Sequence, residues 1–311
     1  MITHRIKLDG PGARGARLSV HVLRVLSELL VETAQRSLRL RVDGRSNLQG
    51  KAAWLDAAVS MDLVGLGEGS TVTYWEAPTL AQAVPDILNQ LPLWDGSPRP
   101  DQTALSIVQE VLRDAASGNA ESDVLDYNIL GSVSDFERLF EMGFQSLEMD
   151  GASGEPARLT LADTGRAREL QRGAPRPERV VVSGYLDELV GSKRSFSLLL
   201  PGGQRVRGLL PEENSHALSA LWTRRVVVDG EAHFRPSGGL SVVAATHIQE
   251  AGPGADVWAR VPRPRPRDLT DLRPRATHGA GENPTAGLLG QWPGDETQDE
   301  LFALLREIEG F

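Results

Sequence analysis

Between residues 178 and 250, the alternation of apolar and polar residues predicts three strands, one helix and two further strands, in that order. This order is typical of an OB-type small barrel, although an SH3-like barrel or a half-open sheet would produce a similar pattern. We therefore expect a small OB-like β-barrel in this segment. The strands are predicted at 180–186, 195–200, 205–210, 225–234 and 240–248, and the helix at 211–222.

Residues 1–174 are predicted to form a separate N-terminal α+β domain of mixed sheet and helix. Ile2, His4, Ile6 and Leu8 alternate with polar residues, which predicts a half-buried strand, and Ser19 is a predicted N-cap for the helix that follows. The other predicted elements are strands at 38–42, 58–66, 70–76, 144–148 and 158–161, helices at 80–91, 105–112 and 163–171, and a short helix through Phe140 that opens with a capping box at Ser134-Asp135-Phe136-Glu137.

A Pro/Arg/Gly-rich segment, residues 251–287, follows the predicted barrel. It contains few large apolar residues and cannot bury enough surface to fold, so we predict a linker. Residues 288–311 then combine acidic residues with apolar residues at helical spacing, which predicts a C-terminal recognition helix. A short helix is marginal in water by itself, so its apolar face needs a partner surface, either on this chain or on another.

Composition excludes several classes of protein. The chain has no cysteine, which excludes disulfides, thiolate nucleophiles and thiolate metal ligands. No apolar run approaches the roughly 20 residues that a membrane span needs, and residues 1–10 do not form the apolar core of a signal peptide. We therefore expect a cytoplasmic protein with no membrane association. The net charge of −9 argues against a surface built throughout for phosphate, but a local basic patch remains possible.

No motif in the sequence predicts catalysis. The six histidines lack the spacing of metal ligands, and no G-x-S-x-G motif or Ser, His and carboxylate arrangement indicates a hydrolase. The glycines at 65–69 lack the lysine and the strand-to-helix context of a phosphate loop, so a hairpin turn explains them better. We therefore predict no catalytic residue, no metal and no cofactor, and we keep an enzyme of unrecognised type in the N-terminal domain as an alternative.

A second alternative is nucleic-acid binding by the predicted barrel, in which arginines contact phosphates and aromatic side chains stack on bases. Nearby acidic residues nearly cancel the basic charge, and Phe196 and Phe234 can equally be barrel core. The predicted nucleic-acid-binding residues are Lys193, Arg194, Arg205 and Arg207, with Tyr185, Phe196, Arg224, Arg225 and Phe234 as further candidates.

The C-terminal segment carries a short motif, Gly290-Gln291-Trp292-Pro293-Gly294, followed by acidic residues and the predicted helix. Over residues 288–311 this segment resembles the toxin-binding tail of bacterial antitoxins that pair with PIN-domain ribonucleases. The resemblance implies a tail that occupies a groove on the toxin, with a basic stretch approaching the toxin's carboxylates. It gives the predicted partner-binding residues as Trp292, Leu301, Phe302, Leu305, Ile308, Arg263, Arg265 and Arg267.

Those antitoxins are usually shorter and begin with a small DNA-binding module, whereas the region before this tail is large and shows no helix-turn-helix pattern. The tail helix can also dock on its own chain. The sequence therefore predicts a non-catalytic bacterial interaction protein, antitoxin-like or accessory in a toxin–antitoxin or defence system. Its first candidate partner is a PIN-type nuclease.

Overall fold

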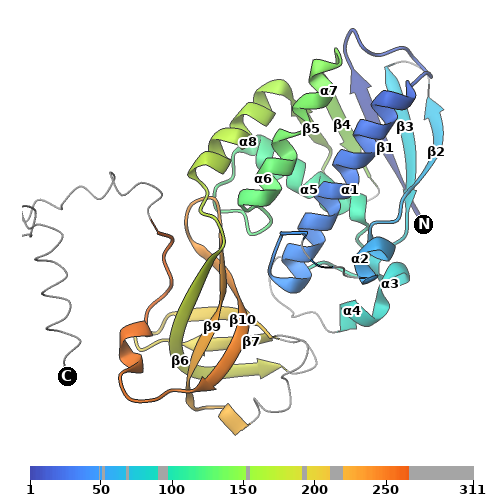
Figure 1. Cartoon of the computed structure of the whole chain (residues 1–311). Coiled ribbons are helices and arrows are strands. Elements are labelled where there is room, and N and C mark those ends of the chain that lie inside the picture. The colour runs from blue at the N-terminus through green and yellow to red at the C-terminus, as the bar shows by residue number, and fades with distance from the viewer. Residues whose placement is uncertain are drawn as a thin grey trace, which may run out of the picture. The chain divides into compact units, whose positions relative to one another are not determined.

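The computed structural model describes residues 1–48, 50, 53–67, 70–89, 97–151, 155–190, 195–210 and 220–265 of the chain. Residues Met1–Arg265 form one compact unit that contains two β-sheets and several helices, so the α+β class is confirmed (Figure 1). Two clusters of buried hydrophobic residues lie within this unit. One uses residues between 6 and 174 and the other uses residues between 182 and 245.

The first cluster is built on a five-stranded sheet with strand order β2-β3-β1-β4-β5, in which every pair of neighbours is antiparallel. The first strand in the chain therefore lies at the centre of the sheet. The strands are β1 (Ile2–Asp9), β2 (Asp62–Gly67), β3 (Thr71–Ala77), β4 (Ser146–Asp150) and β5 (Ala157–Thr160). The helices are α1 (Val20–Asp43), α2 (Ala53–Ala58), α3 (Leu80–Ala83), α4 (Pro85–Asn89), α5 (Ala104–Ser117), α6 (Tyr127–Ser134), α7 (Glu137–Glu141) and α8 (Leu161–Gly173).

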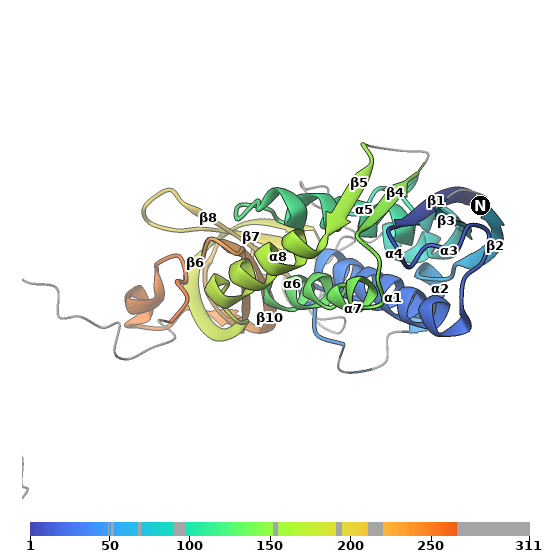
Figure 2. The ribbon, with the colours of Figure 1, turned by 90° about the horizontal axis from the view of Figure 1, so that it is seen from above.

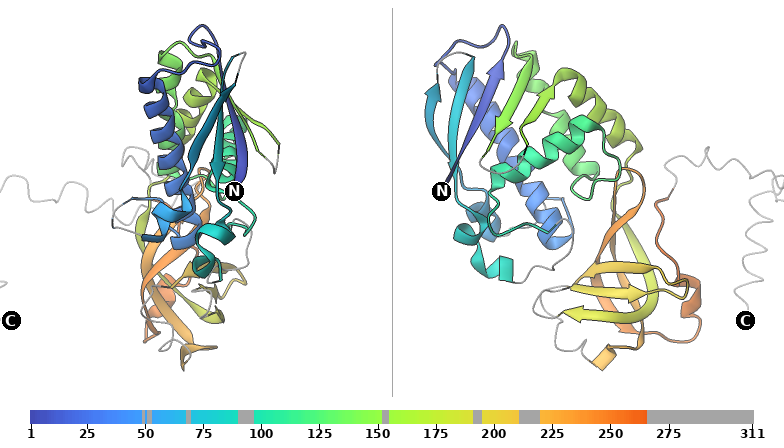
Figure 3. Two further views of the ribbon diagram at one scale, coloured as in Figure 1. Left: turned by 90° about the vertical axis from the view of Figure 1, so that its right-hand side faces the viewer. Right: turned by 180° about the vertical axis from the view of Figure 1, so that it is seen from behind.

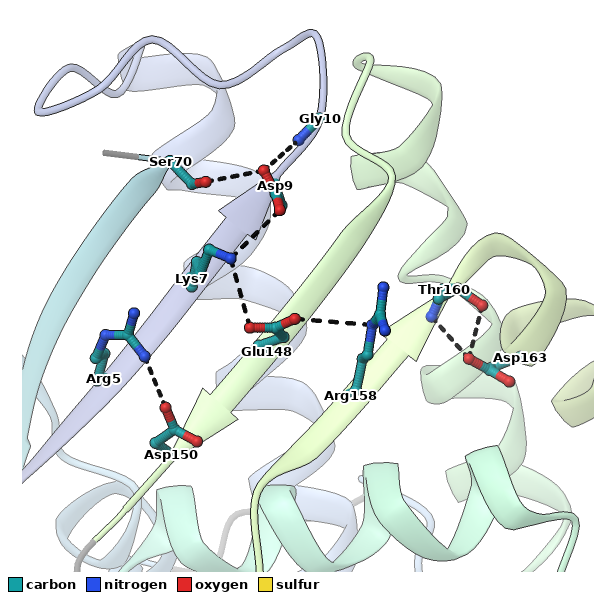
Figure 4. Close-up of polar contacts among 10 residues, drawn as sticks. All are labelled: Arg5, Lys7, Asp9, Gly10, Ser70, Glu148, Asp150, Arg158, Thr160 and Asp163. Carbon is teal, nitrogen blue, oxygen red and sulfur yellow. Dashed lines mark hydrogen bonds and ion pairs between the residues drawn. The ribbon is translucent and has the colours of Figure 1, made fainter. Parts of the chain in front are cut away.

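β1 divides its side chains between the two faces of this sheet, as the alternating pattern predicts. His4, Ile6 and Leu8 are buried, at 1% exposure or less, and Ile6 and Leu8 belong to the hydrophobic cluster to which α1 contributes. Figure 3 (left) shows α1 along one face of the sheet. The side chains between them point to the opposite face, where cross-strand ion pairs join β1 to β4 and β4 to β5 (Figure 4). One face of the sheet is therefore core, and the other is a charged ladder.

The predicted helix after Ser19 is confirmed, and the strand predicted at 38–42 is wrong. Ser19 caps α1 by accepting a hydrogen bond from the Val22 N–H, and the helix continues through Asp43 to a left-handed C-cap at Gly44. Residues 37–41 are all buried, arginines included, so the last turns of α1 lack the polar face that marks a helix in sequence. Leu38, Leu40 and Val42 therefore imitate the alternation of a strand.

The predicted capping box at Ser134 is also wrong. The Ser134 hydroxyl donates backwards to the Leu130 carbonyl at 2.9 Å and belongs to the last turn of α6, a helix that the sequence pattern did not indicate. α7 begins after Phe136 without a side-chain cap. The predicted helix at 80–91 is divided into α3 and α4, because Pro85 cannot continue the first of them.

The second cluster fills a closed barrel with strand order β10-β8-β7-β6-β9. All five predicted strands are present, with ends shifted by a few residues. They are β6 (Glu178–Val190), β7 (Ser195–Leu199), β8 (Arg205–Leu209), β9 (Arg225–Phe234) and β10 (Leu240–Glu250). β8 and β10 pair in parallel and close the barrel, while every other neighbouring pair is antiparallel. Figure 2 labels four of the barrel strands, β6, β7, β8 and β10.

A glycine makes room for an aromatic ring inside this barrel. A Cβ placed on Gly208 would lie 2.0 Å from the Phe196 ring, so no larger residue fits there without moving the ring. Phe196 and Phe234 are each 2% exposed, which makes both of them barrel core rather than binding residues. The predicted helix at 211–222 lies mostly outside the described residues.

Residues 251–265, the first part of the predicted linker, pack on the barrel. They contain a 3-10 helix, Ala255–Trp258, and Val261 contacts the barrel core. The tail residues 288–311 lie outside the described residues, as does the rest of the predicted linker. Among the helices in the described ranges, none combines the length and apolar character needed to cross a membrane.

Candidate functional site

Four strands of the barrel place one residue each in a continuous row. Arg205 of β8 pairs with Leu199 of β7, Leu199 pairs with Tyr185 of β6, and Tyr185 pairs with Arg225 of β9. Directly paired residues project on the same face of a sheet, so these four side chains lie side by side. We call this row the aromatic strip.

The aromatic strip faces outward. Tyr185 is 50% exposed, and Arg205 is also exposed. The next row along the same strands, Leu186, Leu198 and Val206, is buried at 1% exposure or less, as expected from the period of two in a strand. The register of the barrel thus places the exposed ring of Tyr185 next to Arg225, with Leu199 between the ring and Arg205.

Both guanidinium groups of the strip have a carboxylate partner. Arg205 Nη2 lies 3.0 Å from Asp187 Oδ2, and Arg225 Nη2 lies 2.6 Å from Asp256 Oδ1. Arg207, two residues along β8, is exposed on the same outward face and pairs with Ser197. Because Arg205 and Arg225 are each paired with an aspartate, this face carries only a weak net positive charge.

A second exposed aromatic residue, Trp222, stands three positions before Arg225 in the chain. Trp222 is 60% exposed, and the residues after it are tied to β6 because Thr223 N–H donates to the Leu186 carbonyl at 3.1 Å. In return, Leu186 N–H donates to the Arg224 carbonyl at 2.9 Å. Sequence reasoning missed Trp222, although an aromatic residue two positions before consecutive arginines was a signal that could have found it.

Two of the four predicted nucleic-acid-binding residues, Arg205 and Arg207, share the outer face of β8. Lys193 and Arg194 lie outside the described residues. Among the further candidates, Tyr185 and Arg225 lie in the strip. Arg224, which directly precedes β9, forms an ion pair with Glu250 of β10 at 3.1 Å. β10 pairs with the edge of β9 opposite to the edge that pairs with β6.

Two of the predicted partner-binding residues are described. Arg263 is exposed, and Arg265 is bound to the start of β6, where its N–H donates to Glu178 Oε1 at 3.1 Å. The other predicted partner-binding residues, Arg267, Trp292, Leu301, Phe302, Leu305 and Ile308, lie outside the described residues.

A buried polar cluster joins β9 to the region before α6. Asp126 caps α6 through Oδ1, and its Oδ2 accepts a hydrogen bond from Ser46 Oγ at 2.5 Å. His233 of β9 places Nδ1 3.9 Å from Asp126 Oδ2 and Nε2 3.5 Å from Glu231 Oε2. Burial lowers the pKa of His233, but the two carboxylates together raise it by more than burial lowers it. The pKa of His233 therefore lies above its usual value.

This cluster does not have the geometry of a catalytic triad. The Ser46 hydroxyl donates to Asp126 rather than to the histidine, and Ser46 and His233 are both at most 1% exposed, so no substrate reaches them. Two further contacts join the same parts of the chain. Arg235 forms an ion pair with Asp123 at 2.7 Å, and Ser237 N–H donates to the Ala120 carbonyl at 2.9 Å. The cluster therefore has a structural role.

The described residues contain no group of three or more histidine and acidic side chains arranged to hold a metal ion. The buried histidine of the open sheet, His4, contacts the Thr103 hydroxyl through Nε2 at 2.8 Å. Burial lowers the pKa of His4 to about 4, so its ring is neutral near pH 7.

No family model matches the chain, and no curated protein matches it. Among solved structures, the chain is similar to replication protein A from U. maydis bound to single-stranded DNA, with 17% identity over 28% of this chain and 68% of that chain. The TM-score is 0.18. A value this low does not define a common fold, so the function proposed for this chain rests on its own residues.

Proposed function

We propose that the barrel is OB-like and binds single-stranded nucleic acid across the aromatic strip. The observation that carries the proposal is a row on one outer face in which exposed Tyr185 is paired with Arg225, and Arg205 follows on the other side beyond Leu199. Aromatic rings provide stacking platforms for bases of any sequence, and neighbouring guanidinium groups bind the phosphates.

The connectivity of the barrel supports the OB-like assignment. β6 pairs with both β7 and β9, and the barrel closes through the parallel pair β8 and β10. This is a five-stranded arrangement in which strands distant in sequence become neighbours. OB-folds bind oligonucleotides on the face of their second and third strands, and here Leu199 and Arg205 occupy those strands.

The ion pairs of the two arginines in the strip limit how strongly the strip should bind nucleic acid. Asp187 and Asp256 must release their guanidinium partners before a phosphate takes their place, which reduces the net gain. Stacking contributes about 1–3 kcal/mol per base. If two guanidinium groups neutralise two phosphates, the logarithm of the association constant falls with the logarithm of salt concentration with a slope of about −1.4.

Fluorescence anisotropy with labelled 20-nucleotide dT and rU strands tests this proposal. We expect binding at 50 mM salt that weakens with salt as stated and that Tyr185→Ala reduces about tenfold, because one stacking platform is lost. Tyr74→Ala is the matched control, since Tyr74 is an exposed tyrosine on β3 of the other sheet. Absence of binding, or equal losses for the two variants, would refute the proposal.

Partner binding by residues 288–311 remains a second proposal, antitoxin-like or accessory, with a PIN-type nuclease as the first candidate partner. The described chain supports it in one respect: Arg263 is exposed two residues before Arg265, which fixes the chain to β6, so a basic residue stands near the start of the segment that leads to the tail. Co-expression with the product of the adjacent gene tests it. We expect a chain truncated after Ala286 to lose co-purification, and unchanged co-purification would dismiss the tail as the binding element.

A further inference from the structure

The N-terminal core and the barrel core do not share a hydrophobic interior. The cluster of buried hydrophobic residues under the open sheet ends at Ala174, that of the barrel begins at Val182, and no residue belongs to both. The two are connected by contacts of residues 44–46 and 120–126 with Leu209 and residues 231–242 of the barrel. We call this contact region the joint. Parts of a chain that lack a large shared apolar interface can move relative to one another.

The apolar part of the joint is a close approach of backbone to side chains. A Cβ placed on Gly44 would lie 2.7 Å from Leu209 Cδ1 and 3.4 Å from Val242 Cγ1. Leu209 and Val242 are buried, but they belong to neither hydrophobic cluster. The end of α1 therefore rests on the barrel through a glycine and two side chains, and the polar contacts of the joint must hold the rest.

The polar contacts of the joint differ in their access to water. Arg235 and Asp123, 2.7 Å apart, have side chains that are each 29% exposed, so solvent screens their ion pair. His233 and Asp126 are only 1% and 3% exposed. Their closest atoms, Nδ1 and Oδ2, lie 3.9 Å apart, which is longer than a hydrogen bond, so the attraction between them depends on the charge of the ring.

We propose that His233 makes the joint sensitive to pH. The protonated ring holds the barrel against the N-terminal core, and loss of the proton lets the two move relative to one another. This inference does not depend on the proposed function of the barrel.

The groups around the ring favour the protonated form. Asp126 faces His233 from the N-terminus of α6, and Glu231 of the same strand places Oε2 3.5 Å from Nε2. The residue opposite His233 on β10 is uncharged Val242. The other charged groups of the joint are Arg45, whose charge acts on Glu231, and Arg235 with its partners Asp123 and Glu121.

The direction of the pH effect follows from these charges. The two carboxylates hold the pKa of His233 above its usual value of about 6.5, so the ring is charged below that pH and becomes neutral as the pH rises through the folded-state value. Among the described residues, His233 is the one cation paired with Asp126. A neutral ring leaves that carboxylate buried without a counter-charge, and opening of the joint relieves this by admitting water.

A distance measurement on the full chain tests the proposal. Because the chain has no cysteine, Leu161→Cys and Val257→Cys introduce two thiols for spin labels, at exposed sites on α8 and on the 3-10 helix beside the barrel. Double electron–electron resonance should give a narrow distance distribution at about pH 6 and a broader one at about pH 9.5, with a midpoint above 6.5. An unchanged distribution across this range overturns the proposal.

Two histidine variants of the labelled chain locate the group responsible. His233→Gln removes the charge and should give the broad distribution at every pH. His247→Gln is the matched control, since His247 is an exposed histidine on neighbouring β10, and it should behave as the parent chain does. Circular dichroism checks that each variant is folded. A pH dependence that survives His233→Gln, or that His247→Gln also removes, overturns the proposal.

Asp126→Asn separates the charge of Asp126 from its role as a helix cap. Asparagine keeps an oxygen that can cap α6 but carries no charge. The pH-dependent broadening should therefore persist with a midpoint lower by about one pH unit or more, because an opposite charge near the ring has been removed. A midpoint that does not move, or a distribution that is broad at every pH, shows that Asp126 acts only as a cap and overturns the proposal.

Discussion

The open sheet and the barrel each bury one histidine at 1% exposure, but in opposite electrostatic surroundings. His4 of β1 contacts the Thr103 hydroxyl, and burial lowers its pKa to about 4. His233 of β9 lies between the carboxylates of Asp126 and Glu231, and its pKa lies above the usual value. Burial alone therefore lowers the pKa of a histidine, and two nearby carboxylates are enough to raise it above its usual value.

The outer faces of the two sheets also differ in how their charged side chains are arranged. On the open sheet, Arg5 pairs with Asp150 at 2.8 Å, and Lys7 and Arg158 both approach Glu148, so charges neutralise one another from strand to strand (Figure 4). On the barrel, the comparable row runs Arg205, Leu199, Tyr185 and Arg225, so an aromatic residue and a leucine lie between the two arginines. The charged side chains on the open sheet pair with one another, whereas the outer face of the barrel leaves the ring of Tyr185 exposed.

Core truncation should produce the largest effect. Phe136, at 0% exposure, belongs to the core under the open sheet, and Phe136→Ala should lower the free energy of unfolding by about 3–5 kcal/mol through lost burial and a cavity. Phe234→Ala makes the equivalent change in the barrel core. Urea unfolding followed by circular dichroism measures both losses.

The same pair of variants shows whether the two cores unfold together. If they are one cooperative unit, each variant shifts a single transition for the whole unit. If they are separate, each variant shifts only its own transition. A loss below 1 kcal/mol for Phe136→Ala would contradict the assignment of that ring to a packed core.

The two histidines predict opposite pH dependences. Because the folded-state pKa of His4 is depressed to about 4, its contribution is intact above pH 6.5 and is lost as the pH falls toward 4, where the unfolded chain binds a proton that the folded chain does not. Allowing for partial solvent screening, the loss should be about 2 kcal/mol. His4→Gln should flatten this acid limb of the stability profile relative to the exposed control His21→Gln.

For His233 the pH dependence of stability has the opposite sign. Its folded-state pKa is raised, so its contribution is fully present below the unfolded pKa of about 6.5 and is lost as the pH rises through the folded value. Denaturant unfolding of His233→Gln should therefore show less dependence on pH on the alkaline side than the wild-type chain. A variant that changes only the acid limb would show that the carboxylates do not hold the proton on His233.

Breaking the charged ladder should have the smallest effect. Arg5 and Asp150 are about 40% exposed, and a double-mutant cycle of Arg5→Ala and Asp150→Ala should give a coupling energy of about 0.2–1 kcal/mol that decreases in 0.5 M salt. Unfolding curves of the four chains supply the measurement. A coupling above 2 kcal/mol would mean that the open face is shielded from water.

The barrel strands could be predicted from the sequence because apolar residues recur along them and turn-forming residues separate several of them, such as Pro201-Gly202-Gly203 between β7 and β8 and Pro236-Ser237-Gly238-Gly239 between β9 and β10. The strand predicted at 38–42 failed because the last turns of α1 are buried all round, which removes the helical contrast between faces. α6 was missed for a related reason: five of its eight residues are buried and none is exposed, so its sequence shows no clear polar face.

The candidate site was predictable in composition but not in arrangement. Tyr185, Arg205 and Arg225 were identifiable by residue type, whereas their alignment in one row depends on the register of three separate strand pairs. Leu199 belongs to the row only through that register. No local pattern encodes it, because register is set by packing between segments that are distant in the chain.

The central place of β1 determines when the open sheet can be completed during protein synthesis. Its neighbours are β3 and β4, and the second of these ends at Asp150. At about 5–20 residues per second, the first strand leaves the ribosome many seconds before its last partner exists. During that interval the apolar side of a newly made strand must stay covered by α1 or by a chaperone.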